Sequence, residues 1–147
     1  MKVKVITVGK IKDKGLIQLI QYYAKQLKSV EMIEINDEAS ITGMEKEGQK
    51  ILSKTPKDSY VIALAIEGQM MDSVEFANAL DHVMTNFGAH ITFIIGGSFG
   101  LSQSVKDQAN LLLSFSKMTF PHQLMKLILI EQIYRAQAIL SNHPYHK

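Results

Sequence analysis

Two segments in the last third of the chain combine residue types that can bind a small molecule. Residues 94–102 read IIGGSFGLS and residues 113–122 read LSFSKMTFPH. Each begins as an apolar, strand-like run, turns through small or polar residues, and then enters a helical pattern. In an open α/β sheet, ligands bind where the carboxyl ends of strands meet such turns. The two segments therefore predict one pocket built from both.

The glycines at 96, 97 and 100 fit neither of the common nucleotide-binding patterns. They lack the GxGxxG spacing of a dinucleotide-binding turn and the Gly-Lys-Ser/Thr ending of a phosphate-binding loop. Glycine lets the backbone adopt positive φ and lets a ligand approach it closely. A tight strand-to-helix turn without a ligand explains the same residues equally well.

The second segment is more specific, because Ser116, Lys117 and Thr119 interrupt an apolar strand where it should turn. Backbone donors between the walls of Met118 and Phe120 would suit a purine ring and an uncharged, thioether-like group. Pro121 needs no ligand to explain it, since proline is favoured at the first helical position.

The chain ends in NHPYHK at 142–147, which is too polar for a core segment. His143 and His146 without a nearby acid make a poor metal site, so no metal is predicted. His82 and His90 are expected at the surface, and His122 is expected to position the loop before it. No Ser-His-Asp set or carboxylate pair supports a hydrolase.

Lysines are concentrated near the N-terminus, where Lys10, Lys12 and Lys14 follow the first apolar segment. In a parallel sheet they lie at the same edge as the glycine turn. Clustered lysine can follow a phosphate backbone without reading bases. A solvated loop is the alternative.

The composition indicates one globular domain over residues 1–147. Apolar residues make up 46% and charged residues 20%, and the net charge is only +2. The chain has no cysteine, which fits a reducing cytoplasm, and its lysine-bearing N-terminus is expected to be a strand and not a signal peptide. No apolar run approaches the ~20 residues of a membrane span.

Hydrophobic periodicity predicts strands alternating with helices. Strands are expected at 3–8, 30–35, 60–66, 91–95 and 112–115, and helices at 15–28, 44–54, 72–82, 102–112 and 122–141. Residues 36–42 are expected to form a polar loop. Asp72 with Glu75, and Ser102, are the expected helix caps. The pattern predicts an α/β fold, a parallel sheet with helices on both faces.

The last predicted helix is apolar around nearly its whole circumference. Such a helix must be buried on several sides, which a domain of this size can hardly achieve alone. We therefore expect a homodimer in which the helix packs on its two-fold mate. A central helix within one subunit is the alternative.

Four strings in order, at 95–101, 113–123, 131–136 and 143–147, closely resemble the RlmH-type 23S ribosomal RNA methyltransferases of the SPOUT superfamily. The resemblance covers the whole chain. It implies an α/β/α sandwich with a C-terminal deep trefoil knot, although knots are otherwise nearly absent from proteins. It also implies a homodimer in which the tail of one subunit completes the site of the other.

The resemblance implies transfer of the methyl group of S-adenosylmethionine to N3 of a pseudouridine in the helix 69 loop of 23S rRNA, on the assembled 70S ribosome in the cytoplasm. Carried over position by position, the cofactor contacts fall at Leu64, Gly96, Phe115, Ser116, Lys117, Met118, Thr119 and Phe120. The connection at 37–44 looks shorter than in many relatives, and Lys147 stands where many have arginine.

Within that reaction we assign roles by residue chemistry. His146 is the expected general base, because imidazole titrates near working pH. Tyr145 is expected to stack on the target base, and Arg135 and Lys147 to hold phosphates or uracil carbonyls. His143, with Lys10, Lys12 and Lys14, completes the expected RNA contacts. The alternatives are a non-catalytic ribosome-binding module and a nucleotide-dependent hydrolase.

Overall fold

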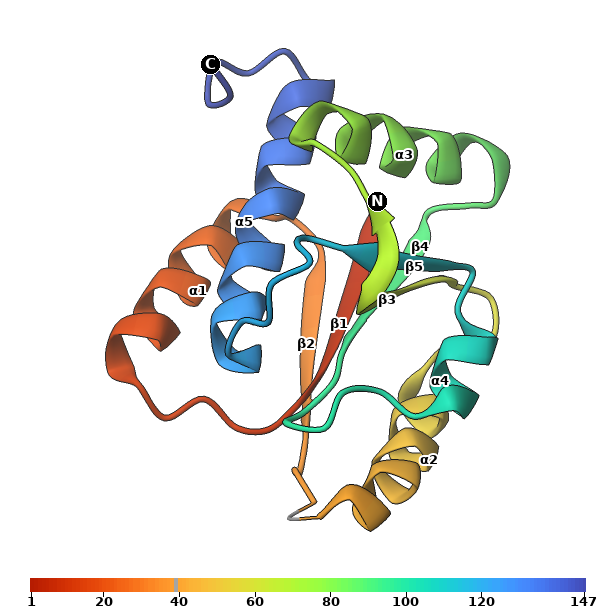
Figure 1. The fold of residues 1–147 in the computed structure, drawn as a ribbon. Helices are drawn as coiled ribbons and strands as arrows, with labels where there is room; N and C mark the ends of the chain where they lie inside the picture. Colours follow the sequence, from red (N-terminus) through yellow and green to blue (C-terminus); the bar gives the residue numbers. More distant parts are fainter. Residues whose placement is uncertain (39) are drawn as a thin grey trace.

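The protein is built on a five-stranded parallel sheet. The structure, a computed structural model, describes residues 1–38 and 40–147 (Figure 1). The strands are β1 (Lys2–Val8), β2 (Val30–Ile35), β3 (Tyr60–Met70), β4 (His90–Ile95) and β5 (Leu111–Ser114). Their order is β2-β1-β4-β3-β5, and every neighbouring pair is parallel. All carboxyl ends therefore meet at one edge of the sheet.

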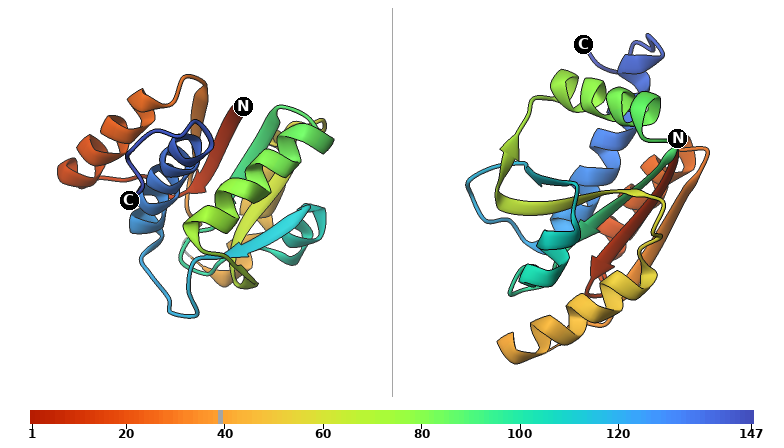
Figure 2. Two further views of the ribbon diagram at one scale, coloured as in Figure 1. Left: turned by 90° about the horizontal axis from the view of Figure 1, so that it is seen from above. Right: turned by 90° about the vertical axis from the view of Figure 1, so that its right-hand side faces the viewer.

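Helices cover both faces of this sheet, as predicted (Figure 2). The α1 helix (Lys14–Gln26), α3 (Ser73–Asn86) and α5 (His122–Leu140) share one hydrophobic core with the strands. The α2 helix (Met44–Lys54) and α4 (Gln103–Gln108) share a second core on the other face, and the 3-10 turn η1 (Ile41–Gly43) precedes α2. The α/β/α sandwich is confirmed, and the trefoil knot stays a prediction.

The predicted caps explain where two helices begin. Asp72 accepts from the backbone N–H of Glu75, and the Glu75 carboxylate accepts from the backbone N–H of Asp72. Ser102 accepts from the backbone N–H of Val105. Each cap satisfies backbone donors that the first helical turn leaves free. Pro121 differs slightly from expectation, because it stands just before the first helical residue, His122.

Two elements differ in length from their predictions because of pairing between distant segments. β3 continues past Ile66 to Met70, where Gln69 and Met70 pair with β5 after an irregularity. A Cβ on Gly68 would lie 2.6 Å from the carbonyl carbon of Leu112, so glycine permits this approach. α4 ends at Gln108 and not at 112, because the Asn110 side chain accepts from the backbone N–H of Val61 and directs the chain into β5.

The remaining boundaries agree within a few residues. α3 runs four residues past His82, to Asn86. His82 and His90 are exposed, as predicted. Residue 39 lies outside the described residues. It belongs both to the polar loop expected at 36–42 and to the connection at 37–44.

The last helix is central to one face of the molecule. α5 lies between α1 and α3, and each of its residues is buried or half-buried (Figure 1). Leu129, Ile130 and Ile133 have no exposed surface. Among the described residues, neither hydrophobic core includes Leu124 or Ile128, although both are half-buried. Packing within one chain thus buries most of the apolar circumference of α5, and a short stripe at Leu124 and Ile128 stays outside both cores.

Candidate functional site

A cavity of about 560 Å³ opens at the carboxyl ends of β3, β4 and β5. We call it the carboxyl-end cavity. Its walls are residues 64–67 in the middle of β3, the β4–α4 turn at 96–101, the β5–α5 loop at 115–121 and the first turn of α5. The two segments singled out from the sequence therefore form one pocket, as predicted. Its volume is that of a typical small-molecule site, about 300–1,000 Å³.

The β4–α4 turn folds back on itself, and glycine makes this possible. A Cβ on Gly96 would lie 2.7 Å from the carbonyl carbon of Gly100, which has φ +83°. The backbone N–H of Gly100 donates to the carbonyl of Gly97 over 3.0 Å. Ser98 Oγ donates to Asp37 Oδ2 over 3.4 Å. The cavity thus meets a wall of backbone, which a larger residue at 96 would push apart.

The β5–α5 loop is held by its own serines. Ser114 Oγ donates to the carbonyl of Ser116, and the backbone N–H of Met118 donates to Ser116 Oγ, both over 3.0 Å. Met118 is 71% exposed and Phe120 is 36% exposed. The loop therefore presents large apolar side chains at the mouth of the cavity.

Seven of the eight predicted cofactor contacts line the cavity. They are Leu64, Gly96, Phe115, Ser116, Met118, Thr119 and Phe120. Lys117 lies in the same loop but is exposed and is not part of the wall.

Several other wall residues were not named as cofactor contacts from the sequence, although Ile95 and Leu101 lie within the segment predicted to form the pocket. Ile95, Leu101 and Met125 line the cavity, although their apolar character is equally typical of core positions. Lys106 and Glu67 form an ion pair of 2.7 Å at the wall. The hydrogen bond from Lys106 lowers the pKa of Glu67. Strand β3 was predicted to end before Glu67, so this pair was not anticipated.

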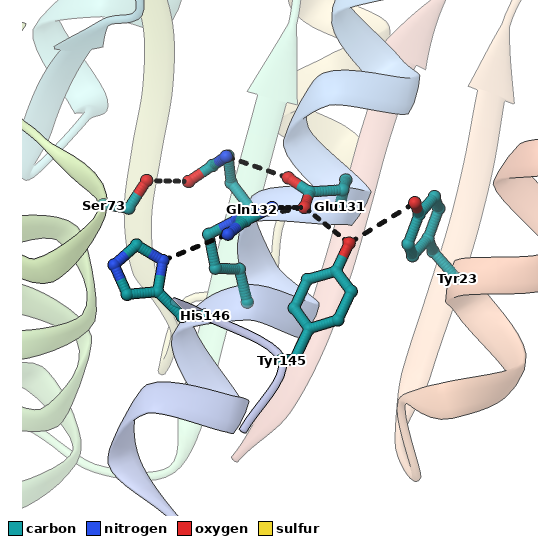
Figure 3. A network of polar contacts seen from close by, with 7 residues as sticks. Tyr23, Ser73, Glu131, Gln132, Tyr145 and His146 are labelled. Carbon is teal, nitrogen blue, oxygen red and sulfur yellow. Dashed lines mark hydrogen bonds and ion pairs between the residues drawn. The ribbon is translucent and has the colours of Figure 1, made fainter. Parts of the chain in front are cut away.

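A second polar site lies about halfway along α5, around Glu131 (Figure 3). Arg135 donates to Glu131 Oε1 through Nε at 3.0 Å and Nη2 at 2.6 Å. The Tyr145 hydroxyl donates to the same oxygen over 2.9 Å. Gln132 donates to Glu131 Oε2 and accepts from Ser73 Oγ. Glu131 therefore ties residues 141–147, which we call the tail, to α5.

Tyrosines enclose this network on one side. The ring of Tyr145 lies edge-on to Tyr134, with centroids 4.6 Å apart, and its oxygen is 3.4 Å from that of Tyr23. The guanidinium carbon of Arg135 lies 4.8 Å from the Tyr145 centroid, a cation–π contact. Burial raises the pKa of Tyr145, and the hydrogen bonds with Tyr23 and Glu131 raise it further. The phenol is therefore neutral at neutral pH.

The position of Arg135 determines which ring nitrogen of His146 accepts a hydrogen bond. Arg135 Nη1 lies 3.0 Å from His146 Nδ1. The hydrogen bond to Glu131 raises the pKa of Arg135, and a guanidinium can only donate. His146 Nδ1 must therefore accept, which leaves the proton of the neutral ring on Nε2. In this arrangement the imidazole has no free lone pair, so its role as a base stays a prediction.

The tail and the carboxyl-end cavity are separated along α5. Arg135, which contacts His146, lies about 20 Å along the helix axis from His122, which lines the cavity. Of the described residues in the cavity wall, none belongs to the tail. Methyl transfer requires reacting atoms about 3–3.5 Å apart. Within one chain, the two sites do not combine.

The predicted RNA contacts are exposed. Lys10, Lys12 and Lys14 lie at the carboxyl end of β1, on the same sheet edge as the cavity, and His143 and Lys147 lie in the tail. Within residues 1–38 and 40–147, no group of three histidine, aspartate or glutamate side chains could hold a metal ion. Over the same residues, no helix is both long and apolar enough to span a membrane.

Comparisons with known proteins give consistent results. A family model described as a predicted SPOUT methyltransferase matches residues 1–146. The chain is 80% identical to the ribosomal RNA large subunit methyltransferase H of Acholeplasma laidlawii (strain PG-8A), and 47% identical to the protein of that name from Bacillus pumilus (strain SAFR-032). Both alignments cover the whole length of both proteins.

Solved structures show the same fold at low sequence identity. A ribosomal RNA small subunit methyltransferase E from Neisseria gonorrhoeae, bound to S-adenosyl methionine, matches with a TM-score of 0.56 at 12% identity, over 95% of this chain and 66% of that one. A probable methyltransferase from Bordetella pertussis Tohama I matches with a TM-score of 0.56 at 10% identity, over 92% of this chain and 95% of that one.

Proposed function

The chain belongs to the SPOUT methyltransferase family, and from this premise we propose that it methylates large-subunit ribosomal RNA with S-adenosylmethionine. The relatives at 80% and 47% identity carry the name of that activity. The observation that carries the proposal is the carboxyl-end cavity, whose wall contains seven of the eight expected cofactor contacts.

The cavity suits S-adenosylmethionine by its chemistry. The wall combines the backbone of the glycine turn with the apolar side chains of Met118 and Phe120. An adenine ring needs backbone hydrogen bonds and apolar faces, and the methionine part needs a wall that tolerates a sulfonium group. When bound, the cofactor supplies an electrophilic methyl group. The chain must then bring the nucleotide to that group and exclude water.

We propose that a second copy of the chain completes the site. The tail contacts α5 at Glu131 and Arg135, and the nearer of these lies about 9 Å along the helix from Met125 in the cavity wall, so we assign the tail to the cavity of another chain. The half-buried stripe of Leu124 and Ile128 on α5 offers apolar surface for that contact. A two-fold pairing would cover the stripe in both copies.

The proposed acceptor is N3 of a pseudouridine in the helix 69 loop of 23S rRNA, on the assembled 70S ribosome in the cytoplasm. N3 carries a proton that must leave, and we assign its removal to His146. RNA that draws Arg135 toward a phosphate or a uracil carbonyl would release His146 Nδ1 as an acceptor. Tyr145 would stack on the base, and Lys147 would contact a phosphate as a point charge.

The test is methyl incorporation from labelled S-adenosylmethionine into 70S ribosomes and into free 23S rRNA, measured in parallel. We expect label in the ribosome sample alone, at one pseudouridine located by primer extension and mass spectrometry. Label at another nucleotide would correct the acceptor. Cofactor binding without label in either sample would indicate a binding module, and no cofactor binding would refute the methyltransferase.

A further inference from the structure

A second hollow, of about 930 Å³, opens at the opposite edge of the sheet from the carboxyl-end cavity. We call it the amino-end groove. It lies where β1, β2 and β4 begin, and the C-terminal half of α1 forms its rim. Its charged lining residues are Lys2, Lys4, Lys25, Lys28, His90, Glu31 and Asp58. None of them belongs to the site described above.

The groove exists because helices cover only part of one sheet face. On the α2/α4 face, β1 presents Lys2, Lys4, Ile6 and Val8 in succession, since alternate side chains share a face. Ile6 and Val8 are buried in the core shared with α2 and α4. Figure 1 shows both helices lying toward the carboxyl ends of the strands. The strand therefore becomes polar at the end that no helix covers.

The same change occurs on the neighbouring strand. On β4, exposed His90 is followed on this face by Thr92 and then by buried Ile94. Thr92 Oγ1 donates to Ser59 Oγ over 2.9 Å, and Thr92 itself is buried beneath the groove.

The electrostatics of the groove favour an anion. Glu31 is the partner of Lys4, at 3.7 Å. Lys2, Lys25 and Lys28 are exposed, and none forms an ion pair with the carboxylates in the described part of the chain. Three free ammonium groups thus surround one hollow. Lysine contacts phosphate as a point charge, without reading sequence.

The outer surface of α1 connects the groove to the tail. Lys25 and Tyr22 are neighbours on the helix surface, three residues apart. Tyr22 is 58% exposed, and its ring stands edge-on to Tyr23, with centroids 5.1 Å apart. The Tyr23 oxygen lies 3.4 Å from that of Tyr145 in the tail. A strand of RNA lying across α1 would therefore meet lysines, then an exposed aromatic ring, then the tail.

We propose that the amino-end groove binds the phosphodiester backbone of ribosomal RNA next to the nucleotide that the tail receives, with Tyr22 stacking on a flanking base. The inference rests on the proposed function, because it takes ribosomal RNA as the substrate. Lys2, Lys25 and Lys28 supply phosphate contacts, and aromatic stacking tolerates any base. The groove thus adds affinity and orientation without selecting the methylated atom.

The test compares two charge reversals on the full chain, Lys28→Glu and the matched control Lys54→Glu. Lys54, the last residue of α2, is exposed like Lys28, which lies two residues past the end of α1, and each change alters the net charge equally. Binding to 23S rRNA is measured against salt concentration. Methylation of 70S ribosomes gives the KM for ribosomes and kcat, and titration gives the affinity for S-adenosylmethionine.

For Lys28→Glu we expect RNA affinity to fall on the order of tenfold at low salt, and the slope of log K against log salt to decrease by about one. The KM for ribosomes should rise, with kcat and cofactor affinity unchanged. Lys25→Glu added to Lys28→Glu should increase both effects, and Tyr22→Leu should weaken binding without changing the slope.

Equal RNA affinities for Lys28→Glu and Lys54→Glu would overturn the inference. A raised KM on ribosomes with unchanged binding to 23S rRNA would assign the groove to a ribosomal protein, which also overturns it. A wild-type chain that methylates neither substrate refutes the proposed function instead. The RNA-binding comparison still reports on the groove in that case, so the two failures are distinguishable.

Discussion

The carboxyl-end cavity and the tail network are built from different parts of the chain. The cavity wall is largely backbone and apolar side chain, with Gly96 held against Gly100 and with Met118 exposed at the mouth. The tail network consists of charged and phenolic side chains that converge on Glu131. One region is suited to holding a cofactor with apolar faces against backbone, and the other to contacting RNA and moving a proton.

Substitutions in the two regions should therefore affect different measured quantities. A change in the cavity wall should alter cofactor affinity, and a change in the tail should alter turnover. The two effects should separate in measurement, because the regions are apart on α5 and are proposed to meet only across two copies. A variant that changes cofactor affinity and turnover together would show that the two regions are not independent.

The largest effect is expected from deleting Tyr145, His146 and Lys147. The deletion removes the proposed base and the phenol bound to Glu131, so methylation of ribosomes should fall on the order of 10³-fold or more. Cofactor affinity, measured by calorimetry, should stay at the wild-type value. If the deletion abolished cofactor binding as well as turnover, the tail would be needed for the structure of the cavity, and the two regions would not be independent.

Gly96→Val addresses the other region. Its side chain would meet the carbonyl group of Gly100, and such overpacking costs about 1–3 kcal/mol. We expect cofactor affinity to fall between about tenfold and a hundredfold. Gly15→Ala, in the first turn of α1, serves as the control, because it lies away from the cavity. Unchanged cofactor affinity in Gly96→Val would show that the glycine turn is not part of the binding wall.

Glu131→Gln tests whether the tail network needs its central charge. The amide keeps the shape but removes the charge that holds Arg135 and accepts from Tyr145. Turnover should fall about tenfold to a hundredfold, since a charge-assisted hydrogen bond contributes about 1.5–3 kcal/mol. Tyr145→Phe leaves the charge in place and should cost less. A fall in cofactor affinity with unchanged turnover would show that Glu131 acts on the carboxyl-end cavity and not on the tail network.

The difference between the regions also explains what the sequence could predict. Helices and strands followed from local patterns, as at Asp72 and Glu75, because periodicity and caps depend on neighbouring residues. The extension of β3 past Ile66 did not, because residues Glu67-Gly68-Gln69 resemble a turn and become a strand only through pairing with β5. A wall residue such as Met125 was missed because an apolar residue beside a cofactor has the same pattern as one in a core.

The tail network was predicted by residue type but not by arrangement. Tyr145, His146 and Arg135 were expected to act together; Arg135 contacts both of the others, and their roles stay predictions. Glu131 lies in one of the matched strings but was given no role, although it is the single acidic residue in the apolar run of α5 and that signal could have marked it. The donation from Arg135 to His146 depends on how the tail folds back, which spacing alone does not determine.

The smallest effect concerns Lys126, which lies on α5 between the two regions. It is 6% exposed, and burial lowers its pKa, with Glu34 as the charge that opposes this. A lysine with a lowered folded pKa binds fewer protons when folded than when unfolded. Its penalty on stability is therefore present at neutral pH and disappears as the pH rises toward the unfolded value.

Lys126→Met should remove this penalty while keeping the length of the side chain. We expect the melting temperature at pH 7 to rise by about 3 °C, corresponding to about 1 kcal/mol, with a smaller gain at pH 10. Lys126→Arg keeps the charge and should give no gain. Because Lys126 is placed in neither region, cofactor affinity and turnover should both be unchanged. A fall in cofactor affinity would extend the cavity along α5 to Lys126, and a fall in turnover would extend the tail network to it. A lower melting temperature would show that the ammonium group of Lys126 stabilises the fold.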